Sequence, residues 1–254
     1  MTPLRLRTAL LCLAVLAASL AAPAPASAQE TRHHRPHAHW HSKPEAVQAL
    51  RLLRAGGNVI FFRHGKTDML AKDQDGGAWP DCSWQRNLSP MGRAAALEMG
   101  KAFGLLEIAV GDVLSSPYCR CMETAQLAFG RVEAVPALAP RASGAPGSGM
   151  RAAGRALREL LARDVPPGTN TVVVAHIFNA LGALGRIPEE GEAFVVRRNT
   201  AGEPEVAAAI TMTQWGDLVR DLRVFGLDPE EDRRTLRPGI DGHAGQAHHA
   251  QPDR

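Results

Sequence analysis

Aromatic residues are scarce in this chain of 254 residues: Phe, Trp and Tyr make up 5% of it, with a single tyrosine. So few rings offer little for nucleic acid bases to stack on, and no segment interleaves aromatics with clustered Lys or Arg. The formal net charge is only +3 at pH 7. We therefore expect no nucleic acid partner, and the modest positive charge favours a small anionic substrate.

Long apolar runs are missing after residue 28. No later stretch approaches the roughly 18 apolar residues that a membrane span needs, so stable membrane insertion is not expected. The first 28 residues have a basic start, an apolar run from Thr8 to about Leu20, and small residues ending at Ala28. This pattern is typical of a secretory signal peptide that is cleaved before Gln29. It predicts a periplasmic or secreted protein.

Cysteine is also rare, and beyond Cys12 in the expected signal peptide only Cys82, Cys119 and Cys121 are present. An odd number in an oxidising compartment suggests one disulfide and one spare thiol. Cys119 and Cys121 flank Arg120 on an expected helix, so their side chains point to different sides and would not easily pair. A Cys82–Cys119 disulfide is therefore favoured, with three reduced thiols as the alternative.

Nothing in the chain repeats at a fixed period, and we expect one domain over residues 44–229. A His-rich flexible tail over residues 29–43 precedes it, and a second flexible tail over residues 230–254 follows. Apolar strand patterns alternate with helical ones, which predicts an α/β fold, a three-layer α/β/α sandwich with a mostly parallel central sheet. Strands are expected at 58–63, 110–114 and 171–175, a hairpin at 192–213, and helices at 44–55, 90–103, 117–129, 150–163 and 179–185.

Only two histidines lie between Ser42 and Asp241, and each ends an apolar strand. His64 ends the first strand, and His176 ends the strand at 171–175. The carboxyl ends of strands in an open α/β sheet border the crevice where such folds bind ligands. We therefore expect both rings to face one ligand site.

Two arginines accompany these histidines. Arg63 precedes His64, and Arg120 falls in the first turn of the helix expected after Ser116-Pro117. Cations are disfavoured near a helix N-terminus, so an arginine there indicates an anionic ligand. Arginine forks bind phosphate through paired hydrogen bonds, and a neutral histidine can attack phosphorus, which divides one difficult displacement into two easier ones. This predicts phosphoryl chemistry with His64 as nucleophile, and with Arg63, Arg120 and His176 around the anion.

Four segments in order resemble the histidine phosphatase superfamily, in its phosphoglycerate mutase-like branch. They are Phe61-Phe62-Arg63-His64-Gly65-Lys66-Thr67, Leu88-Ser89-Pro90-Met91-Gly92-Arg93, Ser115-Ser116-Pro117 with Arg120 and Thr124-Ala125, and Val174-Ala175-His176. The resemblance implies a phosphoglycerate mutase-like fold and a two-step phosphatase that needs no metal or other cofactor. It implies that His64 accepts the phosphoryl group, that Arg63 and Arg120 bind phosphate, and that His176 completes the site. Gly65, Thr67 and Asn179 are further expected substrate-binding residues.

Within that superfamily, three segments resemble an exported group that includes the lipopolysaccharide core heptose phosphate phosphatase. They are Asp81-Cys82, Gln85-Arg86-Asn87-Leu88-Ser89 and Tyr118-Cys119-Arg120. We expect a small or sugar phosphomonoester as substrate, and the sequence specifies only that this substrate is negatively charged.

The chain departs from the family at the acid that protonates the leaving group. Active members usually carry this acid on the loop after the helix of the second arginine, but residues 134–158 contain no Asp or Glu. Glu133, Asp68, Asp73 and Asp75 are possible substitutes. A second departure is Lys66, where the branch usually has an acidic residue.

Two other functions remain open from the sequence. Without an acid, the protein would be a weak enzyme or a phosphate-ligand binding protein. The tail histidines could instead bind Zn²⁺, Cu²⁺ or Ni²⁺, which would make the chain an exported metal-binding protein. The tail histidines are His33, His34, His37, His39, His41, His243, His248 and His249.

Overall fold

A computed structural model describes residues 43–74, 77–140 and 147–225. The predicted signal peptide, most of the His-rich tail and the predicted C-terminal tail lie outside these residues, so they stay predictions, as do the domain limits. Within the described ranges no helix is both long and apolar enough to cross a membrane.

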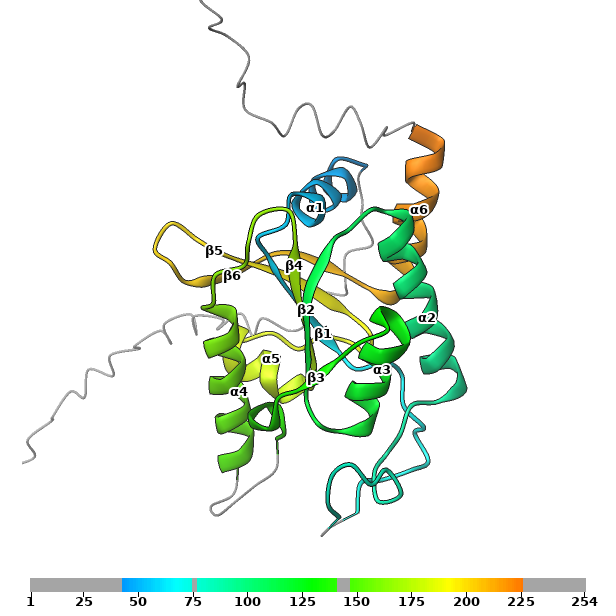
Figure 1. The fold of residues 1–254 in the computed structure, drawn as a ribbon, viewed down its shortest axis with the longest axis vertical. Coiled ribbons are helices and arrows are strands. Elements are labelled where there is room, and N and C mark those ends of the chain that lie inside the picture. Colours follow the sequence, from blue (N-terminus) through cyan, green and yellow to red (C-terminus); the bar gives the residue numbers. More distant parts are fainter. Residues whose placement is uncertain (1–42, 75–76, 141–146, 226–254) are drawn as a thin grey trace, which may run out of the picture. The chain divides into compact units, whose positions relative to one another are not determined.

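The fold is built on one six-stranded sheet with the strand order β3-β2-β4-β1-β5-β6 (Figure 1). β3, β2, β4 and β1 are parallel neighbours, whereas β5 pairs antiparallel with β1 and with β6. The prediction of a mostly parallel sheet is confirmed. The strands are β1 (Val59–Arg63), β2 (Val110–Ser115), β3 (Glu133–Ala134), β4 (Asn170–Ala175), β5 (Ala193–Arg198) and β6 (Pro204–Ile210).

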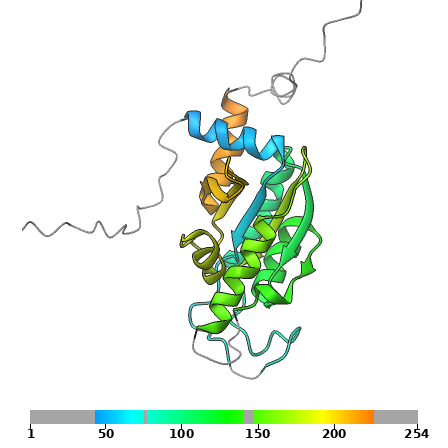
Figure 2. The same ribbon diagram turned by 90° about the vertical axis from the view of Figure 1, so that its left-hand side faces the viewer.

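Helices cover both faces of the sheet, as expected for a three-layer α/β/α sandwich (Figure 2). α2, α3 and α6 pack on one face, and α4 and α5 on the other. The helices are α1 (Lys43–Ala55), α2 (Pro90–Leu105), α3 (Cys119–Phe129), α4 (Ser148–Leu161), α5 (Ile177–Leu184) and α6 (Met212–Phe225), with a short 3₁₀ helix at Pro136–Leu138.

Strand β1 shows how the sequence produces these layers. Side chains of a strand alternate between the two faces of the sheet. Ile60 and Phe62 join the core with α2 and α6, while Val59 and Phe61 join the core with α4. Both faces are buried, so the strand has a continuous apolar sequence up to Arg63.

The parallel arrangement brings the ends of β1, β4 and β2 to the same edge of the sheet. Arg63 is in register with Ala175, and the His64 N–H donates to the Ala175 carbonyl at 3.0 Å. On the other side of β4, the Ser116 N–H donates to the Val174 carbonyl at 2.9 Å. The residues that follow these strands are therefore neighbours.

Three local expectations were wrong or incomplete. The helix of Arg120 begins at Cys119 with Tyr118 as N-cap, two residues after the expected start at residue 117. The edge strand β3 and the helix α6 were not foreseen. Both have short or mixed apolar patterns that gain their stability from packing on the sheet rather than from local periodicity.

Candidate active site

The two histidines lie side by side at the sheet edge, with ring centroids 5.6 Å apart and an interplanar angle of 65°. Each residue is only 3% exposed. Nδ1 of His64 lies 2.9 Å from the Gly65 carbonyl oxygen. Because a carbonyl only accepts, the proton sits on Nδ1 and leaves the lone pair on Nε2. His64 therefore has the tautomer that a nucleophile at Nε2 requires.

Burial and positive neighbours keep both rings neutral. Desolvation, followed by the charge of Arg120, lowers the pKa of His64 to about 3. Desolvation, followed by His64 and Arg120, lowers the pKa of His176 well below its usual value. Charged imidazole is disfavoured in such a place. At neutral pH the site thus offers uncharged imidazole nitrogens beside fixed positive charge.

His176 is held on several sides. Its Nε2 lies 2.8 Å from the Ser116 hydroxyl oxygen, and the Cys121 sulfur lies 3.6 Å from the same nitrogen. The ring packs edge-on against Tyr118, with centroids 4.9 Å apart. Cys121 is buried, and burial raises its thiol pKa to about 12. The thiol is therefore a neutral packing partner of the ring.

Arg120 lies in the first turn of α3 and is 5% exposed. Its Nη1 and Nη2 donate to the two carboxylate oxygens of Asp73, at 2.8 and 3.1 Å. Its guanidinium carbon stacks 4.4 Å from the centroid of the Tyr118 ring. The planar fork is thus fixed in place and holds an oxyanion, here a carboxylate of the same chain.

Arg63 directs its guanidinium to the same edge. Its Nη1 donates to the Pro188 carbonyl at 3.0 Å, and its Nη2 lies 3.6 Å from Glu190 Oε1. The Nε atoms of Arg63 and Arg120 are buried and find no hydrogen-bond acceptor among the residues that the structure describes. Buried donors without acceptors are costly, so these two groups suit an anionic ligand.

Two charged members of the site, Arg86 and Glu190, were not predicted from the sequence. Arg86 donates from Nη1 to the Thr67 hydroxyl and lies 3.6 Å from Glu190 Oε1. The Thr67 hydroxyl donates to the same oxygen at 2.7 Å. Arg86 appears in the sequence only within the Gln85–Ser89 resemblance, and Glu190 follows no strand, so neither showed a local signal of function.

Gly65 and Thr67, both predicted to bind substrate, are buried at this edge. The Gly65 N–H donates to the Thr124 hydroxyl oxygen at 3.0 Å, and that hydroxyl donates to the Arg120 carbonyl at 2.6 Å. A Cβ at Gly65 would lie 3.2 Å from the Gly92 carbonyl oxygen, a tight contact. Thr124 therefore joins the loop of His64 to the helix of Arg120.

Asn179 occupies a different place from the one expected. Its Oδ1 accepts from the His176 N–H at 3.0 Å, while its Nδ2 donates to the carbonyls of Leu138 and Ala153. The side chain is fully buried. Its hydrogen bonds go to backbone groups, so Asn179 anchors the start of α5 and does not turn toward a ligand.

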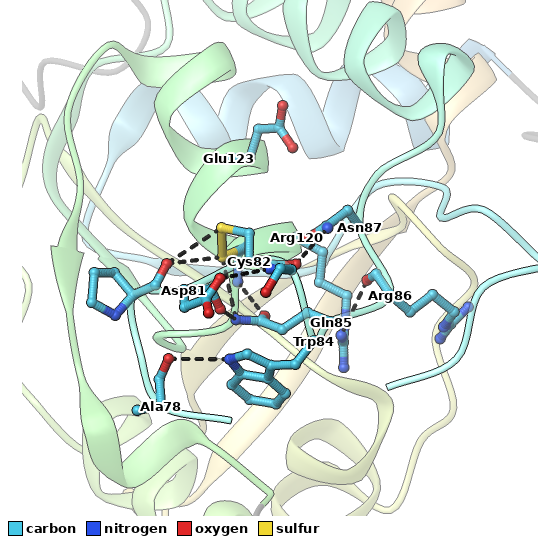
Figure 3. The surroundings of a disulfide bond; sticks show 12 residues. Ala78, Asp81, Cys82, Trp84, Gln85, Arg86, Asn87, Arg120 and Glu123 are labelled. Atoms are coloured by element: carbon cyan, nitrogen blue, oxygen red, sulfur yellow. Dashed lines mark hydrogen bonds between the residues drawn. A yellow bond between two sulfur atoms is a disulfide. The ribbon is translucent and has the colours of Figure 1, made fainter. Parts of the chain in front are cut away.

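The predicted disulfide between Cys82 and Cys119 is present, and Cys121 is the free thiol (Figure 3). It joins the loop after β1 to the residue just before Arg120. Gln85 strengthens this junction, because its Oε1 accepts from the Cys119 N–H at 2.8 Å. The loop that carries Asp73 and Arg86 is thus attached to the first turn of α3.

No group of three or more His, Cys, Asp or Glu side chains within residues 43–74, 77–140 and 147–225 is arranged to hold a metal ion. The tail histidines lie outside these ranges, so the metal-binding alternative is not tested there.

Residues 59–145 match the family described as histidine phosphatase superfamily (branch 1). This segment is similar to that family over about a third of the chain. The match covers His64 and Arg120 and ends before His176, whose place in the site comes from the geometry above. It supports a phosphatase as the class of enzyme. No curated protein matches the chain.

Several solved structures resemble the fold at low sequence identity. The protein histidine phosphatase SixA complexed with tungstate is 17% identical, over 62% of this chain and 98% of that one, with a TM-score of 0.39. A phosphoserine phosphatase mutant from Entamoeba histolytica, in complex with phosphoserine, is 19% identical over 60% and 95%, with a TM-score of 0.42. The alpha-ribazole phosphatase from Shigella flexneri is 15% identical over 59% and 95%, with a TM-score of 0.43.

Proposed function

We propose that the protein is an exported phosphomonoesterase that hydrolyses a small or sugar phosphate through phospho-His64. The observation that carries this proposal is a neutral His64, with its lone pair on Nε2, lying beside His176 and influenced by the charges of Arg63, Arg86 and Arg120. A site with this combination neutralises the charge of the phosphoryl oxygens while the imidazole attacks phosphorus.

In the first step, the Nε2 lone pair of His64 attacks phosphorus and forms a P–N bond. The bond to the leaving oxygen breaks, and its electron pair stays with that oxygen. Arg120 and Arg63 hold the equatorial oxygens, where the charge of the transition state is spread. The Nδ1–H bond to the Gly65 carbonyl stabilises the positive charge that develops on the ring.

In the second step, water attacks phosphorus, and the P–N electron pair returns to Nε2. Neutral His176, 5.6 Å from His64 between ring centroids, can donate its N–H to a phosphoryl oxygen in both steps. The leaving oxygen takes up one proton and the attacking water loses one, so the two steps also require a group that donates and then accepts a proton.

The substrate class rests on the charge of the site and on the resemblance to the exported group. Three guanidinium groups, from Arg63, Arg86 and Arg120, face two carboxylates, from Asp73 and Glu190. This leaves one net positive charge, which suits an anion. Export rests on the predicted signal peptide, and a heptose phosphate is one sugar phosphate to test.

The deciding experiment is phosphate release from 4-nitrophenyl phosphate, with and without a chelator. We expect release by the native chain, no effect of the chelator, and loss of about a thousandfold or more in His64→Ala, because the covalent route is gone. A phosphoryl group on the His64 peptide, found by mass spectrometry after an alkaline quench, would identify the intermediate.

Other outcomes would favour the alternatives. Vanadate binding without phosphate release would indicate a phosphate-ligand binding protein. Activity or folding that requires added metal would contradict the metal-free mechanism. Phosphate release that persists unchanged in His64→Ala would overturn the proposal.

A further inference from the structure

We infer that Asp73 is the general acid that protonates the leaving group and then the base that activates water. This inference rests on the proposed phosphatase reaction and supplies the acid that residues 134–158 do not contain. It depends on which carboxylates the fold brings to the arginines of the site.

Asp73 contacts the anion-binding arginine directly. Its Oδ1 and Oδ2 accept from Arg120 Nη1 and Nη2 at 2.8 and 3.1 Å. Oδ1 also accepts from the Arg86 N–H at 2.8 Å. The carboxylate thus occupies the fork that would bind two phosphoryl oxygens, and it has a second, backbone anchor beside that fork.

The other acidic candidates lie elsewhere or have other contacts. Glu133 is exposed on β3, and β4 and β2 separate that strand from β1, a distance of about 14 Å across the sheet. Asp68 is exposed and accepts from the Leu70 N–H at 2.9 Å. Asp75 lies outside the described residues.

Glu190 also reaches the site and, like Asp73, accepts hydrogen bonds there. Its Oε1 accepts the Thr67 hydroxyl at 2.7 Å and lies 3.6 Å from both Arg63 and Arg86. Its side chain is 16% exposed, against 37% for Asp73. Asp73 is thus the more solvent-accessible of the two carboxylates that contact an arginine of the site, which suits a group that meets a leaving group from the solvent side.

Substrate binding would release the Asp73 carboxylate from Arg120 and leave it free to exchange a proton with the substrate. A phosphoryl dianion that takes the Arg120 fork displaces one negative charge and brings two. Three guanidinium groups then face Glu190 and the dianion, so the charges balance. The displaced carboxylate, still close to the Arg86 N–H, takes up one proton from solvent as the dianion binds.

With Asp73 as acid and base, each proton in the two steps has a donor and an acceptor. As the P–N bond to His64 forms, the Asp73 carboxyl proton passes to the leaving oxygen, which departs as an alcohol. In the second step the Asp73 carboxylate takes a proton from the attacking water, and the P–N electron pair returns to His64. The products are one alcohol and one inorganic phosphate, and the Asp73 proton returns to solvent when the carboxylate binds Arg120 again.

The test compares kcat/KM for two substrates that differ in their need for an acid, 4-nitrophenyl phosphate and an alkyl phosphate such as glycerol 2-phosphate. In Asp73→Asn we expect a loss of about a hundredfold or more for the alkyl ester and of about fivefold or less for the aryl ester. The ratio of the two values is independent of the fraction of folded enzyme. It also cancels any change in phosphate affinity caused by removing the Asp73 charge.

Asp81→Asn is the matched control, because Asp81 lies on the same loop, is exposed and accepts from the Ser83 N–H. It should leave both values unchanged. Equal losses for both esters in Asp73→Asn, or no loss for the alkyl ester, would sink the inference. If Asp73→Asn does not fold, the same ratio is measured in Asp73→Ser, which also lacks a carboxyl group, and a ratio equal to that of the native chain gives the same negative result.

The proposed function fails separately. If the native chain forms no phospho-His64 from the aryl ester, the phosphatase proposal is wrong whatever Asp73 does. If Asp73→Asn still forms phospho-His64 from the aryl ester and fails only on the alkyl ester, both proposals stand.

Discussion

At the scale of single residues, the site is organised by short hydrogen bonds between side chains and backbone. Thr124 is one of these residues. It is 1% exposed, and its hydroxyl accepts from the Gly65 N–H and donates to the Arg120 carbonyl. One hydroxyl group therefore sets the position of the nucleophile's loop relative to the anion-binding helix.

Replacing Thr124 by valine keeps the side-chain volume and removes this link. The Gly65 N–H loses its acceptor in a buried place, which costs about 1–3 kcal/mol, and the loop of His64 is free to shift. We expect kcat/KM for 4-nitrophenyl phosphate to fall about tenfold or more, while Thr124→Ser, which keeps the hydroxyl, stays within about threefold of the native chain. Equal activity of the valine and serine variants would contradict this positioning role.

At the scale of elements, the placement of Arg120 depends on how closely α2 and α3 approach. A Cβ at Gly100 in α2 would lie 2.2 Å from the Ala128 carbonyl oxygen of α3. Gly104 is exposed and lies one turn further along the same helix, and nothing lies within 4 Å of a Cβ built there. The two glycines thus differ in packing while sharing a helix.

We expect Gly100→Ala to lower the free energy of unfolding by about 1–3 kcal/mol, because backbone must move to admit the methyl group. Gly104→Ala, the matched control, should raise it by up to about 1 kcal/mol through helix propensity. Urea denaturation of both variants measures the difference. A Gly100→Ala protein as stable as the native chain would show that the two helices separate at little cost.

At the scale of the whole molecule, the burial of two neutral histidines connects stability to pH. The folded pKa of His64 is about 3 and that of His176 lies well below its usual value, whereas unfolded histidine titrates near 6.5. Below about pH 6.5 the unfolded chain takes up protons that the folded chain refuses. The fold is therefore most stable above pH 6.5 and loses stability as the pH falls toward 3.

Urea denaturation at pH 7.5, 6 and 5 checks this expectation. The free energy of unfolding should fall below pH 6.5 by up to about 1.4 kcal/mol per pH unit for each buried histidine. His64→Gln removes one titrating group, so its slope should be smaller than that of the native chain. A native slope of zero, or identical slopes, would contradict the neutral buried state.

The sequence by itself determined the alternation of strands and helices, the two strand-end histidines, the two arginines and the Cys82–Cys119 pair. These follow from local periodicity, from turn residues and from the side on which neighbouring residues of a helix point, and all of these properties are short in range. β3 and α6 were not predicted from the sequence, because their stability comes from packing on the sheet.

Only the tertiary structure decided which other side chains meet the two histidines. It brought Arg86 and Glu190 into the site and directed the Asn179 side chain to backbone groups. It also paired Asp73 with Arg120, which lies 47 positions away in the chain. The direction of a loop side chain is set by partners that are distant in sequence, and no local pattern encodes them. Periodicity therefore located the edge of the sheet where the site lies, while long-range contacts selected the charges that surround it.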